Sequence, residues 1–576
     1  MNCERLIAVA HGEQPADLVF KNARIVNVFT GSIEEAGVAV AEGCIAGFGD
    51  YADAAEVIDL SGKLLAPTFI DPHIHLESTM LTPAEFARLV LPRGTTATVS
   101  DPHEIANVMG LEGIKLMLDT SEGLPFDFFF TLSSCVPATT METSGASLGA
   151  SDLETLIDHP RILALAEMMN FPGVIYRDPD VMAKLALAHQ HAMIIDGHAP
   201  LLSGSDLNAY IAGGIRSEHE CTQLSEAHEK LAKGMWIFLR QGTTEKNLLE
   251  LLPLVNETTA SRCCFASDDL HPPDILAEGH INASVRLAIE HGLKPVTAIR
   301  MASLNPATYF RLDFRGAIAP GYLADMQVLS DLADGLLAPL AVYKEGKLVA
   351  AEGELRVDLT APAVAGRAVQ TVKLERELAP DDFRVKRDGA KLRAIRVIPG
   401  QIVTAAEEVD AGDAAFVESR PDEDLLKLVV VERHTGRGGH ATGFVRGFGF
   451  KRGAIASSVA HDSHNLICVG VSDADIALAL NHLARMQGGF VVVSDGEVRA
   501  ALPLPLAGLM SLQSGREVAS ELDALLAVSH DELGGALANP FMALSFLALP
   551  VIPQLKLTDR GLVDVDKFEI VPLFLR

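Results

Sequence analysis

The chain has 576 residues, enough for three or four domains at roughly 150 residues each, or for fewer if one is a large barrel. Its 47 Lys and Arg against 76 Asp and Glu give a formal net charge of -29. Such a charge would repel nucleic acid and anionic membrane surfaces, so neither is expected as a partner. A hydrophobic content of 48% with 21% charged residues is typical of a folded globular protein rather than a disordered chain.

Neither a membrane segment nor a disulfide framework is expected. The N-terminal stretch contains Glu4 and Arg5 and lacks the unbroken apolar run of a signal peptide, while the uncharged stretch 540–555 contains Pro550 and Pro553. The seven cysteines are odd in number and form no C-x-x-C pair, which disfavours both a disulfide framework and a zinc ribbon. We therefore expect a protein of the reducing cytoplasm.

The first elements in chain order are short β-rich pieces separated by glycines, at residues 18–60. The same pattern of short β-rich pieces separated by glycines recurs at residues 319–355. The two stretches are expected to pair in space, as parts of one sheet structure that flanks an insertion. They predict a small β-sandwich domain formed from both ends of the barrel described next, residues 1–65 plus 318–361.

Between residues 66 and 317, short apolar runs alternate with amphipathic stretches. Alternating strands and helices indicate a parallel sheet, and eight candidate strands in about 250 residues fit a (β/α)8 TIM-type barrel. Residues 362–576 contain strand-like runs and a helical segment at 477–487, which predict a separate C-terminal α+β domain. The predicted fold class is thus α/β: a barrel, a flanking β-sandwich and an α+β domain.

The strongest local signal is the sequence Asp71-Pro-His73-Ile-His75-Leu-Glu77 at the end of an apolar run. Residues i and i+2 of a strand point to the same face, so His73 and His75 can offer two imidazoles to one metal ion. Barrel enzymes place their chemistry at the carboxyl ends of the strands. The pair is therefore a candidate metal site.

Further candidate ligands recur at the ends of later apolar runs, with barrel spacing. They are Glu167, His198, His219 and Asp268. The interval from His73 to Glu167 is 94 residues, about three βα units of roughly 31 residues, and the next intervals are 31, 21 and 49. This spacing assigns the six ligands to the first, fourth, fifth, sixth and eighth strands.

The order of these ligands resembles that of the amidohydrolase superfamily, metal-dependent barrel hydrolases with a flanking β-domain. Four stretches extend the likeness along nearly the whole chain to the bacterial adenine deaminases. They are PTFIDPHIHLESTM, SDPHEIANVMG, HTGRGGHATGFVRGFGF and SSVAHDSHNLICVG. The resemblance implies hydrolytic deamination of adenine to hypoxanthine and ammonia, a preference for adenine over adenosine, and a homodimer.

The resemblance also bears on the metal. Many binuclear members bridge their metals with a carboxylated lysine on the fourth strand, whereas this chain has Glu167 there, which disfavours dihydropyrimidinase-like and urease-like activities. Two divalent ions are expected, Mn or Fe by resemblance, with Zn also compatible with His and carboxylate ligands. A mononuclear deacetylase also has a carboxylate at this point, so the metal count stays open.

Divalent metals lower the pKa of bound water, so such a site supports hydrolysis. In an aminopurine the attack would fall on C6. Asp268 can take the proton from the attacking water, with Asp269 as the second candidate for that role, and Glu220 can carry protons to the ring and the leaving amine. The alternative for Glu220 is a structural place at the start of the next helix.

His103 and His464 are candidate substrate-binding residues, together with Asp269. His103 with Glu104 could instead be a structural pair at a helix start, and His464 could belong to a network between domains. Two other functions stay open: another cyclic-amide or amine hydrolase of the superfamily, and a metal-free barrel that serves as a binding scaffold.

Overall fold

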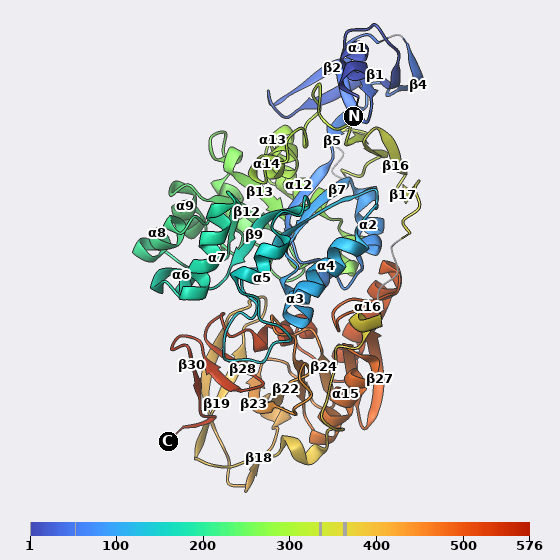
Figure 1. The fold of residues 1–576 in the computed structure, drawn as a ribbon. Helices are drawn as coiled ribbons and strands as arrows, with labels where there is room; N and C mark the ends of the chain where they lie inside the picture. The colour runs from blue at the N-terminus through green and yellow to red at the C-terminus, as the bar shows by residue number, and fades with distance from the viewer. Residues whose placement is uncertain (1, 52, 333–336, 361–365, 576) are drawn as a thin grey trace.

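The computed structural model describes residues 2–51, 53–332, 337–360 and 366–575. A flanking sheet, a central barrel and a C-terminal domain follow one another along the molecule (Figure 1). Within these ranges no helix combines the length and the apolar character needed to cross a membrane.

Eight parallel strands form the barrel in the described part of the chain. They are β6 (Phe69–Ile74), β7 (Thr95–Ser100), β8 (Asp127–Leu132), β9 (Ile162–Met168), β10 (Ile194–Gly197), β11 (Ser217–Glu218), β12 (Trp236–Arg240) and β13 (Cys263–Ala266). The ring closes at two places: Ile74 bridges to Asp268 beyond β13, and the Arg216 N–H donates to the Ile195 carbonyl at 3.0 Å. The predicted barrel is confirmed.

Apolar side chains fill the barrel interior. Seven of the eight strands contribute to one buried cluster, which includes Ile70, Val99, Phe129, Phe238 and Cys264. Side chains from strands all around a ring can share one cluster only inside the ring, because neighbouring residues on each strand point to opposite faces. This packed layer supports the polar side chains at the carboxyl ends of the strands.

Helices lie on the outside of the barrel (Figure 1). The principal ones are α2 (Pro83–Val90), α3 (His103–Met109), α4 (Leu111–Thr120), α7 (Pro179–Gln190), α8 (Gly204–Ala212), α9 (Leu224–Ala232), α12 (Ile281–Glu290) and α13 (Pro295–Ala302). Their buried faces pack against the outer faces of the strands, so both sides of each strand are covered, as a parallel sheet requires.

The two β-rich stretches pair, as predicted, in one nine-stranded sheet. Its strands are β1 (Ala16–Asn27), β2 (Ser32–Ala41), β3 (Cys44–Phe48), β4 (Ala54–Asp59), β5 (Leu64–Pro67), β14 (Met326–Leu329), β15 (Ala341–Lys344), β16 (Lys347–Ala351) and β17 (Glu354–Leu355). The junction is β5 beside β14, antiparallel, with Leu65 opposite Val328. The predicted limit between residues 65 and 66 falls inside β5, because this strand stays in the sheet through Pro67. The predicted limit between residues 361 and 362 lies outside the described residues.

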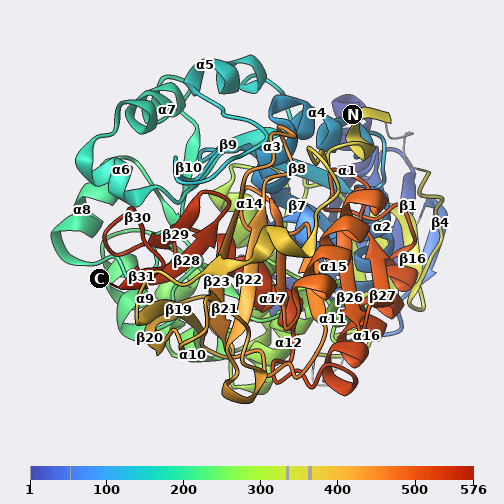
Figure 2. The same ribbon diagram turned by 90° about the horizontal axis from the view of Figure 1, so that it is seen from below.

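The C-terminal domain is α+β and covers the end of the barrel away from the flanking sheet (Figures 1 and 2). Its main sheet contains β20 (Thr404–Asp410), β19 (Lys391–Val397), β23 (His440–Arg446), β22 (Leu426–Val431), β25 (Leu466–Gly470), β24 (Ala454–Ser457), β26 (Gly489–Ser494), β27 (Glu497–Pro503) and β31 (Phe574–Leu575). The smaller sheet is β28 (Leu555–Thr558), β29 (Gly561–Asp564) and β30 (Glu569–Val571), and the principal helices are α15 (Asp473–Met486), α16 (Gly515–Asp531) and α17 (Pro540–Ser545).

Candidate active site

The six side chains that the sequence assigns to a metal site all lie at the carboxyl ends of barrel strands. They are His73 within β6, His75 directly after it, Glu167 within β9, His198 after β10, His219 after β11, and Asp268 after β13. These are the first, fourth, fifth, sixth and eighth strands, as the spacing predicts. None of the six residues is more than 8% exposed.

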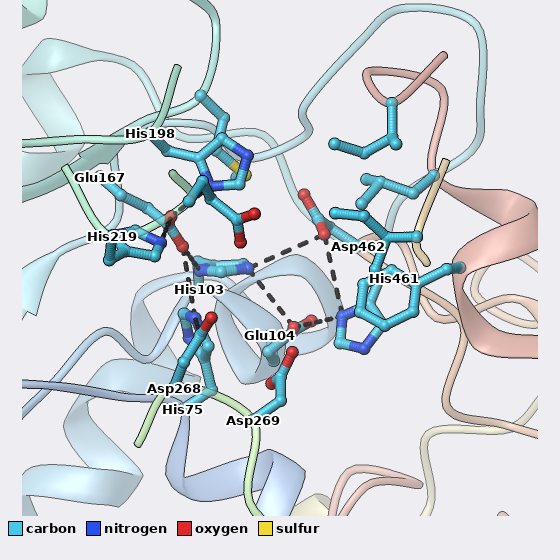
Figure 3. Close-up of a pocket in the computed structure, with 16 residues that line it drawn as sticks. His75, His103, Glu104, Glu167, His198, His219, Asp268, Asp269, His461 and Asp462 are labelled. Carbon is cyan, nitrogen blue, oxygen red and sulfur yellow. Dashed lines mark hydrogen bonds and ion pairs between the residues drawn. The ribbon is translucent and has the colours of Figure 1, made fainter. Parts of the chain in front are cut away.

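Glu167 lies at the centre of the group, among three histidines (Figure 3). One carboxylate oxygen is 2.8 Å from His198 Nδ1 and 3.1 Å from His219 Nε2, and the other is 3.4 Å from His75 Nε2. A carboxylate whose two oxygens face different imidazoles is placed to connect two neighbouring ligand sets.

Asp268 completes the group from the opposite side. Its Oδ1 lies 3.1 Å from His75 Nε2 and 3.5 Å from His73 Nε2. The Asp268 N–H donates to the His73 carbonyl at 3.0 Å, so the chain beyond β13 is fixed to β6. The backbone of Asp268 is left-handed, with a φ of 57°, a conformation that is uncommon for residues other than glycine and is often found at functional sites.

The residues present fit a metal ion. His73 Nε2 and His198 Nε2 are buried without a hydrogen-bond partner in the described residues, and buried polar atoms normally have one. Three of the ligand atoms, one each from His73, Glu167 and His219, lie within 4.8 Å of one another, and so do those of His73, His75 and Asp268. Four imidazoles and two carboxylates without a thiolate suit several first-row divalent ions.

Glu220 enters the same cavity as His219. Strand β11 ends at Glu218, and the Glu220 N–H donates to Glu218 Oε1 at 2.8 Å, so the chain turns directly after the strand. Helix α9 begins only at Leu224. The alternative of a helix-start role for Glu220 is therefore wrong, and its carboxylate lines the cavity at the metal-ligand cluster.

Arg240, the last residue of β12, was missed by the sequence analysis. Its guanidinium donates to Asp268 Oδ2 at 2.6 Å and, through both terminal nitrogens, to the carboxylate of Glu220. Burial alone would lower the pKa of Arg240, but the carboxylates of Glu220 and Asp268 raise it above its ordinary value. One cation thus compensates two buried anions. A charged residue at the end of the apolar run WIFLR was the available signal.

His103 fits both interpretations of the sequence. It is the first residue of α3 and also lines the cavity, with its ring centre 4.6 Å from that of His75. Its Nδ1 lies 3.1 Å from Asp101 Oδ2, and Nε2 faces Glu104 at 3.4 Å. The His103 side chain therefore lies between the metal-ligand cluster and the residues of the C-terminal domain (Figure 3).

Glu104 connects the barrel to the C-terminal domain. It bonds to His461 Nδ1 at 2.5 Å through one oxygen and to His464 Nε2 through the other. His464 Nδ1 accepts from the Ala460 N–H at 3.2 Å, so both of its ring nitrogens are used. His461 lines the cavity and His464 does not. His464 thus belongs to the network between domains, the alternative that the sequence left open, rather than to the cavity wall.

Two carboxylates face the cavity with unpaired oxygens. Asp269 Oδ1 and Asp462 Oδ2 are buried and have no hydrogen-bond partner in the part of the chain that the structure describes. Burial and the adjacent Asp268 carboxylate raise the pKa of Asp269. A larger cavity of about 1140 Å³ adjoins the site between the barrel loops and the C-terminal domain, and shares Met169, Glu220, Ile402 and Ile552 with it.

Two family models match the chain. That of the amidohydrolase family matches residues 64–349, and that of the adenine deaminase C-terminal domain matches residues 401–569. Among solved structures, an adenosine deaminase from Xanthomonas campestris with bound zinc overlaps 60% of this chain and 95% of its own, with 17% identity and a TM-score of 0.45, a likeness too distant to inform the site.

Curated relatives match over nearly the whole length. The chain is 51% identical to adenine deaminase of Desulfatibacillum aliphaticivorans, over 99% of both chains. It is 48% identical to adenine deaminase 2 of Carboxydothermus hydrogenoformans, over 99% of both, and 49% identical to adenine deaminase of Syntrophobacter fumaroxidans, over 99% of this chain and 98% of that one. The chain therefore belongs to the adenine deaminases of the amidohydrolase family.

Proposed function

We propose that this protein is a metal-dependent hydrolase that deaminates adenine to hypoxanthine and ammonia. The observation that carries the proposal is the convergence of four imidazoles and two carboxylates from five strands on one buried cavity. The family membership supplies the substrate, since the relatives are adenine deaminases over their full length.

The residues that would hold the metal are His73, His75, Glu167, His198, His219 and Asp268. We propose two divalent ions, Mn or Fe, with Zn also compatible with this ligand set. When bound, such ions lower the pKa of water enough to supply hydroxide near neutral pH. Glu167 would serve both ions, a proposal supported by its two oxygens, which face different histidines.

The chain's own carboxylates would move the protons. Arg240 donates hydrogen bonds to both Asp268 and Glu220, so it holds both carboxylates at the cavity. Asp268 takes the proton of the attacking water as the new C6–O bond forms. Glu220 relays the two protons that the water loses, the one taken by Asp268 and the one left on the new hydroxyl, to the ring nitrogen and to the amine, and the C6–N bond then breaks to release ammonia. One water is consumed for each hypoxanthine and ammonia formed.

Adenine itself would lie between the metal-ligand cluster and the C-terminal domain. His103 and Asp269 are proposed to contact it, since both line the cavity. His464 would act only indirectly, through Glu104. The homodimer and the cytoplasmic location expected from the resemblance stay predictions.

The test is a panel of aminopurines and cyclic amides assayed for ammonia release with purified, metal-loaded protein. Adenine should have the highest kcat/KM of the panel. Turnover of a cyclic amide but not of adenine would favour another hydrolase of the family. A purified protein that takes up no metal and turns over no member of the panel would favour a metal-free binding scaffold.

A further inference from the structure

The C-terminal domain supplies much of the wall of the cavity that holds the metal-ligand cluster. Its contributions are Ile402, His461, Asp462, Phe546, Leu549 and Ile552. All six lie in the region matched by the adenine deaminase C-terminal domain, residues 401–569. The barrel provides the residues proposed for hydrolysis. Residues that select the substrate are therefore expected in the part of the cavity wall that the C-terminal domain provides.

Asp462 is a polar residue of this wall whose hydrogen-bonding capacity is not fully used. It is 2% exposed, and its Oδ2 has no hydrogen-bond partner in the described residues. Its Oδ1 is 3.8 Å from His103 Nε2 and 3.9 Å from His461 Nδ1, beyond hydrogen-bond distance in both cases. Both distances are within reach of an ion pair, so Oδ2 is the oxygen left without a partner, and a buried oxygen without a hydrogen bond is costly. A ligand that brings an N–H group would remove that cost.

Asp462 Oδ2 is an acceptor without a hydrogen-bond partner among the described residues, and two neighbouring groups bear on it. His461 is engaged by Glu104 through Nδ1. Burial, followed by the nearby Asp462 carboxylate, raises the pKa of Glu142 well above its ordinary value, which favours the neutral form of Glu142. The free Oδ2 of Asp462 therefore favours a ligand that brings a hydrogen-bond donor.

The surroundings of Asp462 suit a flat ring. The His461 imidazole stacks on Phe546, with 4.7 Å between ring centres and 14° between planes. Leu549 and Ile552 add apolar surface to the same wall. Flat apolar and aromatic surfaces fix the plane of a heterocycle, while a few polar groups fix its orientation.

The position of Asp462 fits the far end of a purine. The His103 imidazole separates it from the metal-ligand cluster, with Nδ1 3.5 Å from Glu167 and Nε2 3.8 Å from Asp462 (Figure 3). With C6 at the cluster, the imidazole ring of adenine would lie toward the C-terminal domain. Free adenine has an N–H on that ring. A nucleoside has a sugar in place of the N9 hydrogen.

We propose that Asp462 accepts a hydrogen bond from the imidazole N–H of the free purine base and thereby excludes N9-substituted purines from the site. This inference rests on the proposed function, because the orientation of the base follows from placing C6 at the cluster. A site built to bind a substrate N–H discriminates strongly against analogues that lack it.

The test compares adenine, N9-methyladenine and N7-methyladenine as substrates of the wild type, Asp462→Ala and Asp462→Asn. The methylated bases remove the N–H of either tautomer without adding a sugar. The wild type should prefer adenine to N9-methyladenine. In Asp462→Ala, kcat/KM for adenine should fall by about 10- to 100-fold, the range that one hydrogen bond to a charged group provides. The loss should lie mostly in KM, because the contact exists in both the ground state and the transition state.

The preference for adenine over the methylated base should fall by the same factor in Asp462→Ala. Asp462→Asn keeps the shape of the side chain and removes the charge, so we expect a smaller loss in the same direction. This variant carries the test if Asp462→Ala does not fold. Asp566→Asn is the matched control, since Asp566 is an exposed carboxylate of the same domain that lines only the larger cavity. Metal content should equal that of the wild type in all three variants.

Calorimetric binding of the same three bases separates failure of this inference from failure of the proposed function. If the wild type binds adenine without deaminating it, the proposed function is refuted. The role of Asp462 is then still tested by the ratio of the Kd for N9-methyladenine to the Kd for adenine, compared between the wild type and the Asp462 variants. Folded, metal-loaded Asp462 variants that keep the wild-type preference within about threefold would overturn the role of Asp462. So would a wild type that does not discriminate against N9-methyladenine.

Discussion

Replacing Arg240 with methionine removes the cation that holds Glu220 and Asp268 in place. The guanidinium makes three hydrogen bonds to these carboxylates, at 2.6 Å to Asp268 and through two nitrogens to Glu220. A hydrogen bond to a charged group contributes about 1.5–3 kcal/mol, but such contributions are not additive. Removing one partner of a buried ion pair costs about 3–5 kcal/mol, because the remaining charge is left without compensation. We expect a loss of that size in the free energy of unfolding.

The same change should lower kcat. General acid and base catalysis is worth about 10²- to 10⁴-fold, and Glu220 can supply it only when its carboxylate is held toward the cavity. We expect Arg240→Met to lose at least about 10²-fold in kcat. Arg240→Lys should be intermediate, because an ammonium group cannot span two carboxylates as a guanidinium does.

A double-mutant cycle with Glu220→Gln separates positioning from general destabilisation. If Arg240 acts through Glu220, the double variant should be little slower than the slower of the two single variants. Arg262→Met is the control, since Arg262 is an exposed arginine. A folded Arg240→Met protein with kcat within about threefold of the wild type would refute this reasoning.

Two further changes have definite expected outcomes. Glu220→Gln should lower kcat by about 10²- to 10⁴-fold with bound metal unchanged; a loss below about threefold, with metal retained, would move the proton transfer to another residue. Burial lowers the pKa of Lys556 to about 7, and its ammonium donates to the Ile402 and Phe546 carbonyls at 2.9 and 3.0 Å. In the unfolded chain Lys556 keeps its proton up to about pH 10, so between pH 7 and 9 the unfolded state binds more protons than the folded state. The free energy of unfolding of the wild type should therefore rise relative to that of Lys556→Met over this range, by up to about 1.4 kcal/mol per pH unit. Below pH 7 the difference in stability between the two proteins should not depend on pH. Parallel pH profiles of Tm for the two proteins would contradict the lowered pKa.

The barrel and its ligand positions could be predicted from the sequence because both depend on local periodicity. Strand alternation puts His73 and His75 on one face, and the regular βα repeat places Glu167 and Asp268 at the same end of the ring. The predicted limit after residue 65 falls inside β5, because β5 belongs to the flanking sheet and leads directly toward β6. Composition does not change at that point.

Arg240 and Asp462 could not be predicted because their roles depend on contacts between distant segments. Arg240 reaches Glu220 only because β11 and β12 are neighbours in the closed ring. His461 meets Glu104 across 357 residues of sequence. In the segment from His461 to His464, the chain has no regular periodicity, so the sequence could not show which side chain faces the cavity. It favoured His464, whereas His461 and Asp462 line the wall.

The measurement that tests the central claim most directly is ammonia release from adenine before and after removal of metal, with the metal content of each sample verified by elemental analysis. Metal-stripped protein should be inactive, and reloading with Mn²⁺ or Fe²⁺ should restore turnover as the ions occupy the site. Full-rate deamination by protein shown to contain no metal would contradict the assignment of His73, His75, Glu167, His198, His219 and Asp268.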